Sequence, residues 1–153
     1  MNIKGLITED FINYKKPAMT VMFPCCTFKC GTEYCQNSTL AKEKNINLEI
    51  NDIVKRYIDN PITEAIVMQG LEPFDSWKDL FDLIIQVRKI SKDDIVIYTG
   101  YNKNEIEDYI KVLCTFENII VKYGRYIPGN DKHYDKILGV YLASDNQYAE
   151  KIS

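Results

Sequence analysis

The sequence predicts an α/β fold: a single domain with a partial, open (βα) barrel-like, mostly parallel sheet that helices flank. Two observations favour this class. Short apolar runs alternate with amphipathic stretches of helical spacing, which is typical of βαβ units. The chain has 153 residues, of which 46% are hydrophobic, and no repeat, low-complexity tract or linker divides it. We therefore expect one domain over residues 1–153.

Local patterns predict the helices and strands. Ser76 and Asn102 each precede an acidic residue by three positions, Asp79 and Glu105, which is the spacing of a helix-capping box. Asn51 is also of a residue type that caps helices. Helices are expected over residues 51–59, 76–87 and 102–113, and strands over 18–23, 65–68, 95–98 and 119–121, with a further apolar stretch at 139–143.

Three distinctive segments follow the first three expected strands. A cysteine cluster follows residues 18–23, the segment 70–73 follows the second strand, and 99–101 follows the third. Ligands of parallel sheets bind beyond the carboxyl ends of the strands, which meet at one edge. We expect the functional site at this edge.

Charge and hydropathy exclude several classes of function. The net charge is −3, and Lys and Arg are interspersed with Asp and Glu, so no basic stripe indicates nucleic-acid binding. No apolar run approaches the ~20 residues of a membrane span. The first residues include Lys4, Glu9 and Asp10, which is unlike a signal peptide. We expect a cytoplasmic protein that binds neither nucleic acid nor membrane.

Four of the five cysteines, Cys25, Cys26, Cys30 and Cys35, lie close together. The odd count argues against a disulfide framework and favours a metal or redox site. Three thiolates in one loop can hold three corners of a [4Fe–4S] cluster and leave its fourth iron open, whereas four cysteines are usual for such clusters. Cys25 fits a strand end better than a ligand position, and Cys114 ends an amphipathic helix and is expected in the core.

Three other interpretations of the cysteines remain open. One is a structural zinc site, although zinc usually takes two separated pairs of ligands. The others are a thiol redox switch, although no C-x-x-C pair exists, and unreactive thiols that behave as small hydrophobic groups. His133 is the only histidine and lies in a polar stretch, so a Ser-His-Asp hydrolase is disfavoured.

The cysteine loop at 25–35 resembles the radical S-adenosylmethionine motif, normally C-x3-C-x2-C, and the chain is similar to the activating proteins of anaerobic (class III) ribonucleotide reductase. Five further segments resemble segments of that family and occur in the same order. They are 35–37 (C-x-N), 69–73 (Gly-Gly-(Glu/Asp)-Pro), 97–101 (Thr-Gly-Tyr), 124–126 (Gly-Lys/Arg-Tyr/Phe) and 144–147 (Ser-x-Asn-Gln). The chain departs from the family in its C-x4-C spacing, in Leu71 in place of the second glycine, and in Tyr123 in place of an aspartate. The longer spacing leaves open a ligand set with Cys25 in place of Cys26.

The resemblance implies a set of roles. The implied cofactors are a [4Fe–4S] cluster and S-adenosylmethionine, and the implied partners are an external one-electron reductant and a large glycyl radical enzyme, the anaerobic ribonucleotide reductase. A 5′-deoxyadenosyl radical would abstract a glycine hydrogen from that enzyme. The alternatives are a radical enzyme acting on a small molecule and a non-catalytic zinc-bound interaction module. The implied cluster ligands are Cys26, Cys30 and Cys35; Glu72 and the Gly70 carbonyl would bind the methionine ammonium, Phe28 would pack on the adenine, and Thr99 and Asn146 would also contact the cofactor.

Overall fold

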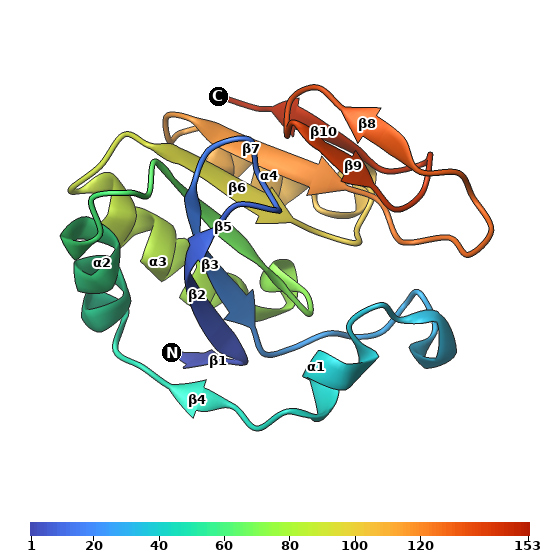
Figure 1. The fold of residues 1–153 in the computed structure, drawn as a ribbon, viewed down its shortest axis with the longest axis horizontal. Helices are drawn as coiled ribbons and strands as arrows, with labels where there is room; N and C mark the ends of the chain where they lie inside the picture. The colour runs from blue at the N-terminus through green and yellow to red at the C-terminus, as the bar shows by residue number, and fades with distance from the viewer.

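A six-stranded sheet lies at the centre of the computed structural model, which describes residues 1–153 (Figure 1). Its strand order is β10-β7-β6-β5-β3-β2. The inner strands pair in parallel, and the two outer strands pair antiparallel to their neighbours, so the sheet is mixed. The strands are β2 (Gly5–Asp10), β3 (Ala18–Phe23), β5 (Ala65–Gly70), β6 (Asp94–Tyr98), β7 (Ile119–Tyr123) and β10 (Tyr148–Lys151).

The predicted α/β fold and its four inner strands are confirmed. Each expected parallel strand is present, and helices connect them as βαβ units require. A barrel-like closure of the sheet stays a prediction. The helices are α1 (Ser38–Lys42), α2 (Ile50–Asp59), α3 (Trp77–Arg88) and α4 (Glu107–Leu113). Short strands complete the fold: β1 (Asn2–Ile3) pairs with β4 (Ile46–Asn47), and β8 (His133–Asp135) pairs with β9 (Val140–Leu142).

The larger core lies between one face of the sheet and the helices. Alternate strand residues such as Val21, Met68 and Val121 are fully buried on this face, together with Leu83 of α3 and Ile53 of α2. Figure 1 shows α2 and α3 side by side against the sheet. The apolar side chains that recur at every second strand residue therefore pack against the apolar faces of the helices in one layer.

The predicted helix caps were partly wrong. Asn102 and Glu105 form the capping box as expected, at a 3-10 turn, Lys103–Glu105, that leads into α4. Ser76 makes no capping bond, because another 3-10 turn, Pro73–Ser76, precedes α3 and is capped by the Glu72 side chain. Asn51 lies inside α2, which begins one residue earlier.

The β8–β9 hairpin covers part of the opposite face of the sheet. Leu138 and Leu142 from this region pack on Val67 and Ile120 in a second, smaller core. The buried Asp135 carboxylate accepts hydrogen bonds from the backbone N–H groups of Ile137 and Leu138 (both 2.9 Å) and of Ala149 in β10 (3.0 Å). One carboxylate therefore ties the hairpin to the edge of the sheet.

None of the helices combines the length and the apolar character that crossing a membrane requires.

The anchor at Asp135 predicts a measurable loss of stability. Asp135→Ala leaves backbone donors without an acceptor, two of them in buried residues, and should lower the free energy of unfolding by about 2–4 kcal/mol. Urea unfolding measures the change. Asp131→Ala, at an exposed position of the same segment, is the control and should change it by less than about 0.5 kcal/mol. Equal stability of the two variants would contradict the anchoring role.

Candidate functional site

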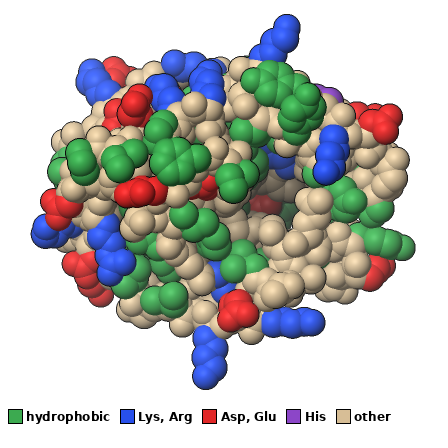
Figure 2. Space-filling model, in the orientation of Figure 1, with side chains coloured by type: hydrophobic (Ala, Val, Ile, Leu, Met, Phe, Trp, Pro, Cys, Tyr) green, Lys and Arg blue, Asp and Glu red, His purple; other side chains and the backbone are tan.

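A cavity of about 360 Å³ lies at the carboxyl edge of the parallel strands. The cysteine loop, the ends of β5, β6 and β7, and the β9 strand line it. Figure 2 shows the hollow in the face of the molecule turned to the viewer, with apolar side chains around it. The position agrees with the sequence-based expectation for the site.

Most of the predicted site residues line this one cavity. Phe28 and Asn146 do not line it, and neither does Cys25, which is exposed. The predicted residues in the lining are Cys26, Cys30, Cys35, Gly70, Glu72 and Thr99.

A short 3-10 turn, Thr32–Tyr34, occupies the interval between Cys30 and Cys35. A 3-10 turn advances only about 2.0 Å per residue, against about 3.3 Å for extended chain. The backbone N–H of Cys35 bonds the carbonyl of Thr32 (3.4 Å), and the Cys30 and Cys35 thiols lie beside each other. The turn therefore takes up the extra residues of the C-x4-C spacing and keeps both thiols in the cavity.

The three thiols do not converge on one point. No three His, Cys, Asp or Glu side chains of the chain are grouped to hold a single metal ion. Burial raises the pKa of Cys26 to about 11, and burial together with Cys35 raises the pKa of Cys30. Because thiolates are the ligands of iron, binding a cluster here must release the thiol protons.

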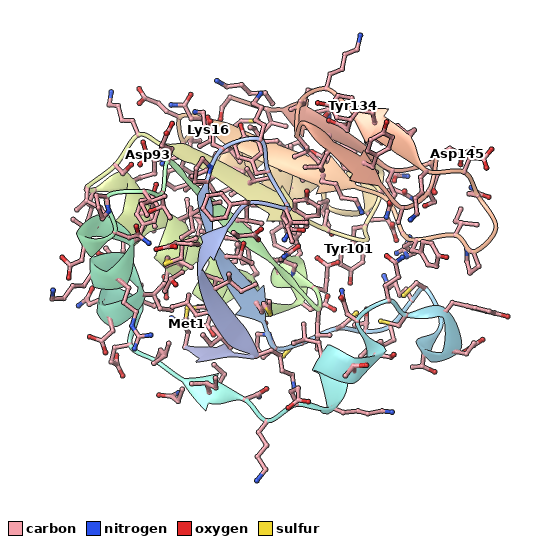
Figure 3. The ribbon with its side chains drawn as sticks, viewed as in Figure 1. Met1, Lys16, Asp93, Tyr101, Tyr134 and Asp145 are labelled. Carbon is pink, nitrogen blue, oxygen red and sulfur yellow. The ribbon has the colours of Figure 1, made fainter.

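Asp75 attaches the cysteine loop to the sheet. Its carboxylate accepts hydrogen bonds from the backbone N–H of Thr27 (2.7 Å) and from the hydroxyl of Tyr101 (2.6 Å). The side-chain hydroxyls of Thr27 and Tyr101 lie 3.3 Å apart. Tyr101 lies between the strand ends and the loop (Figure 3). Lys29 and Arg125 approach its ring, at 4.9 and 5.5 Å from the centroid, as cation–π contacts do.

The second attachment runs through Gly70 at the end of β5. The Asn37 amide donates to the Gly70 carbonyl (2.6 Å), and the backbone of Gly70 has a φ of +104°. A Cβ at Gly70 would lie 2.7 Å from the backbone nitrogen of Phe23 in β3, so only glycine fits. The carbonyl keeps one lone pair for another donor.

Glu72 is a buried carboxylate with three donors. Its Oε1 accepts the Thr99 hydroxyl (2.8 Å) and the Phe74 N–H (3.2 Å), and its Oε2 accepts the Gly100 N–H (2.9 Å). Burial nevertheless raises the pKa of Glu72 to about 7. A cation bound in the cavity would favour the ionised form and lower this pKa again.

Sequence reasoning missed a lysine in the cavity. Lys122 is 7% exposed and lines the cavity from β7. Arg125 also lines it, in the segment 124–126 that the resemblance had singled out. Arg125 makes a two-point ion pair with Glu105 (2.7 and 2.8 Å), and this hydrogen bonding lowers the pKa of Glu105 to about 2.

Asn146 and Phe28 lie outside the cavity lining. Asn146 donates to the carbonyl of Arg125 (2.8 Å) and accepts the Ser144 hydroxyl (2.7 Å), so it braces the chain beside the site. Its neighbour Gln147 lines the cavity instead. Phe28 has a φ of +52°, and its N–H points to the Cys26 sulfur (3.2 Å). Their predicted cofactor contacts stay predictions.

Comparison with known protein families places most of the chain in one of them. Residues 18–147 match the family described as the 4Fe-4S single cluster domain. The chain belongs to this family. No curated protein and no solved structure matches the chain. The family supports the predicted iron–sulfur cofactor over structural zinc, and the use of S-adenosylmethionine stays a prediction.

The raised pKa of Glu72 predicts how stability depends on pH in the cluster-free protein. A carboxyl whose pKa is higher in the folded than in the unfolded state stabilises the fold at low pH, and this contribution is lost as pH rises from about 4.5 to about 7. Relative to Glu72→Gln, the wild type should lose about 3 kcal/mol of unfolding free energy between pH 4 and pH 8. Denaturant titrations at both pH values measure this difference, and exposed Glu43→Gln is the control.

The Asp75 attachment predicts a change in loop dynamics. Tyr101→Phe keeps the ring and removes the hydroxyl that donates to Asp75, so opening of the loop around Thr27 should become easier by about 1 kcal/mol. Hydrogen exchange of the amides in residues 25–37 should then be about fivefold faster. Tyr109→Phe, whose ring packs on Trp77 outside the site, should leave exchange unchanged. Equal exchange in both variants would show that the Tyr101 hydroxyl does not hold the loop.

Proposed function

We propose that the chain is a radical S-adenosylmethionine enzyme that installs a glycyl radical on an anaerobic ribonucleotide reductase. One observation carries the proposal: three cysteine thiols and a buried glutamate line a single cavity at the carboxyl edge of a parallel sheet. The thiols suit an iron–sulfur cluster, and the glutamate suits a ligand with an ammonium group.

The donor set fits a cluster with one open iron. Cys26, Cys30 and Cys35 line the cavity, and no fourth cysteine does. When bound, a [4Fe–4S] cluster supplies single electrons at low potential, which is the chemistry that reductive cleavage of S-adenosylmethionine to methionine and a 5′-deoxyadenosyl radical requires. An external reductant would provide the electron.

The Glu72 carboxylate fits the ammonium of the methionine moiety. Thr99 and Gly100 orient it with two hydrogen bonds, which leaves Oε2 able to accept a further donor from the cavity. A charge-assisted bond to an ammonium is stronger than one to a neutral donor. The free lone pair of the Gly70 carbonyl is a second acceptor in the same lining.

The size of the cavity favours a protein as the substrate. At about 360 Å³ it is near the lower end of the ~300–1,000 Å³ range of small-molecule sites, so the cluster and S-adenosylmethionine would leave no room for a further small molecule as substrate. Ile12, Tyr34 and Tyr141 line the cavity and are exposed. An apolar mouth of this kind suits contact with another protein, and the resemblance of the motif segments implies that this protein is an anaerobic ribonucleotide reductase.

The test is anaerobic reconstitution with iron and sulfide, reduction with dithionite, and electron paramagnetic resonance with and without S-adenosylmethionine. We expect a [4Fe–4S]⁺ signal that changes when S-adenosylmethionine is added, release of 5′-deoxyadenosine, and a glycyl radical signal when a reductase of this class is present. Cys26→Ala, Cys30→Ala and Cys35→Ala should each lose most of the ~4 bound iron atoms per chain.

Cys25→Ala and Cys114→Ala are the matched controls, because both residues are exposed and outside the cavity lining. The expectation that Cys114 lies in the core was wrong, since α4 turns this end of the helix to the surface. Both variants should retain the iron and the spectral change. A cluster whose spectrum is insensitive to S-adenosylmethionine would refute the radical chemistry. Cleavage of S-adenosylmethionine without a glycyl radical on any such reductase would refute the activase role alone.

A further inference from the structure

Arg125 is a positive charge that is fixed in place beside the cysteine loop. Its guanidinium makes a two-point ion pair with Glu105, and it lies 5.5 Å from the centroid of the Tyr101 ring (Figure 3). The backbone carbonyl of Arg125 accepts the Asn146 amide (2.8 Å). A planar guanidinium that is bonded at two points and packed on a ring has little freedom to move away. Both the backbone and the side chain of Arg125 are therefore held.

The ion pair turns its positive end to the cavity. Arg125 and Cys30 both line the cavity, whereas Glu105 does not. Burial and Cys35 raise the pKa of Cys30, and the charge of Arg125 acts in the opposite direction. Hydrogen bonding to Glu105 raises the pKa of Arg125 further, so the guanidinium stays charged. The Cys30 sulfur thus lies in the field of a permanent cation.

The surroundings of Cys26 have the opposite charge. Burial raises the pKa of Cys26, and the carboxylates of Glu72 and Asp75 add to this effect. An iron–sulfur cluster becomes more negative when it takes up an electron, so nearby carboxylates disfavour its reduction and a nearby cation favours it. Arg125 therefore opposes the two carboxylates in their effect on an electron placed in this cavity.

We propose that Arg125, positioned by Glu105 and the Tyr101 ring, raises the reduction potential of the [4Fe–4S] cluster. In this reduction one electron passes from the external reductant to the cluster, whose charge falls from 2+ to 1+, and no bond forms or breaks. The inference rests on the cluster-binding part of the proposed function, and it does not depend on S-adenosylmethionine. Arg125 acts through its charge and is not an iron ligand. Its presence allows a weaker one-electron donor to reduce the cluster.

A purely structural role for Arg125 makes a different prediction. If the ion pair with Glu105 only tied the segment after β7 to the 3-10 turn before α4, breaking it would lower stability without a shift of potential that follows the sign of the charge. The same turn offers a comparison, because Lys103 pairs with Glu150 (2.7 Å) and neither residue lines the cavity. The two ion pairs therefore separate the effect of charge at the cavity from the effect of fastening the turn.

The experiment is a redox titration of the reconstituted protein, without oxygen and without S-adenosylmethionine, followed by the electron paramagnetic resonance signal of the reduced cluster. Arg125→Met removes the cation and should lower the ratio of reduced to oxidised cluster at a given potential by about three- to tenfold. At 59 mV per tenfold for one electron, the midpoint falls by about 30–60 mV. Glu105→Gln keeps an acceptor for the Asn102 N–H and removes the anion, so it should raise the midpoint.

Two further variants complete the set. Arg125→Lys keeps the charge without the two-point pair, and its midpoint should lie closer to that of the wild type than to that of Arg125→Met. Lys103→Met is the matched control and should leave the midpoint unchanged. Glu105→Gln and Arg125→Lys decide the question if Arg125→Met does not take up the cluster.

Three results overturn the inference. The first is a midpoint that does not change in any variant of Arg125 or Glu105. The second is a shift in the same direction for Arg125→Met and Glu105→Gln, which would favour the structural role. The third is an Arg125→Lys midpoint that equals that of Arg125→Met, because the charge would then have no effect.

Failure of the proposed function is visible in a different sample. A wild type that takes up no cluster overturns the cluster-binding part of the proposed function, and the role of Arg125 with it. A wild-type cluster whose signal is insensitive to S-adenosylmethionine, beside variants whose midpoints shift as expected, refutes the radical chemistry and leaves the role of Arg125 intact.

Discussion

Glu72 is the residue through which three strand ends are joined. Its backbone N–H bonds the carbonyl of Cys25 after β3 (2.7 Å), and its carboxylate accepts donors from Thr99 and Gly100 after β6, while the residue itself follows β5. The parallel register of β3, β5 and β6 brings these segments to one edge, and the glutamate fixes them to one another. The cysteine loop, the cavity and the placement of its charges all depend on this junction.

The inner part of the fold follows from the sequence because its strands are buried on both faces. Residues 18–23, 65–68, 95–98 and 119–121 are nearly continuous apolar runs, which buried parallel strands require. The outer strands β2 and β10 have mixed sequences, GLITED and YAEK, because the edge of a sheet tolerates polar residues. Their pairing comes from tertiary contacts, so local pattern does not reveal it. The prediction that Ser76 caps a helix was wrong for a similar reason, since the Glu72 side chain caps the 3-10 turn that precedes α3.

The candidate site, like the fold, could be predicted from the sequence only in part. The cysteines and Glu72 are recognisable in sequence because their residue types and order carry the chemistry. Lys122 is not, because a single lysine in a strand looks the same whether it faces solvent or a cavity, and only the packing on both sides distinguishes the two. The motif implies a cofactor contact for Asn146, which stays a prediction, and the structure shows its amide hydrogen-bonded to Arg125 and Ser144.

The 3-10 turn at Thr32–Tyr34 has a consequence for recognising relatives of this chain. The turn accommodates additional residues between Cys30 and Cys35 and adds little to the distance that the chain spans. The number of residues between these cysteines can therefore vary while the thiols stay in the cavity. A search that demands a fixed C-x3-C-x2-C pattern would pass over such proteins. Gly70, by contrast, cannot be replaced by a residue with a side chain, because the backbone of Phe23 lies against it. Evolutionary drift should therefore lengthen or shorten the ligand loop long before it changes that glycine.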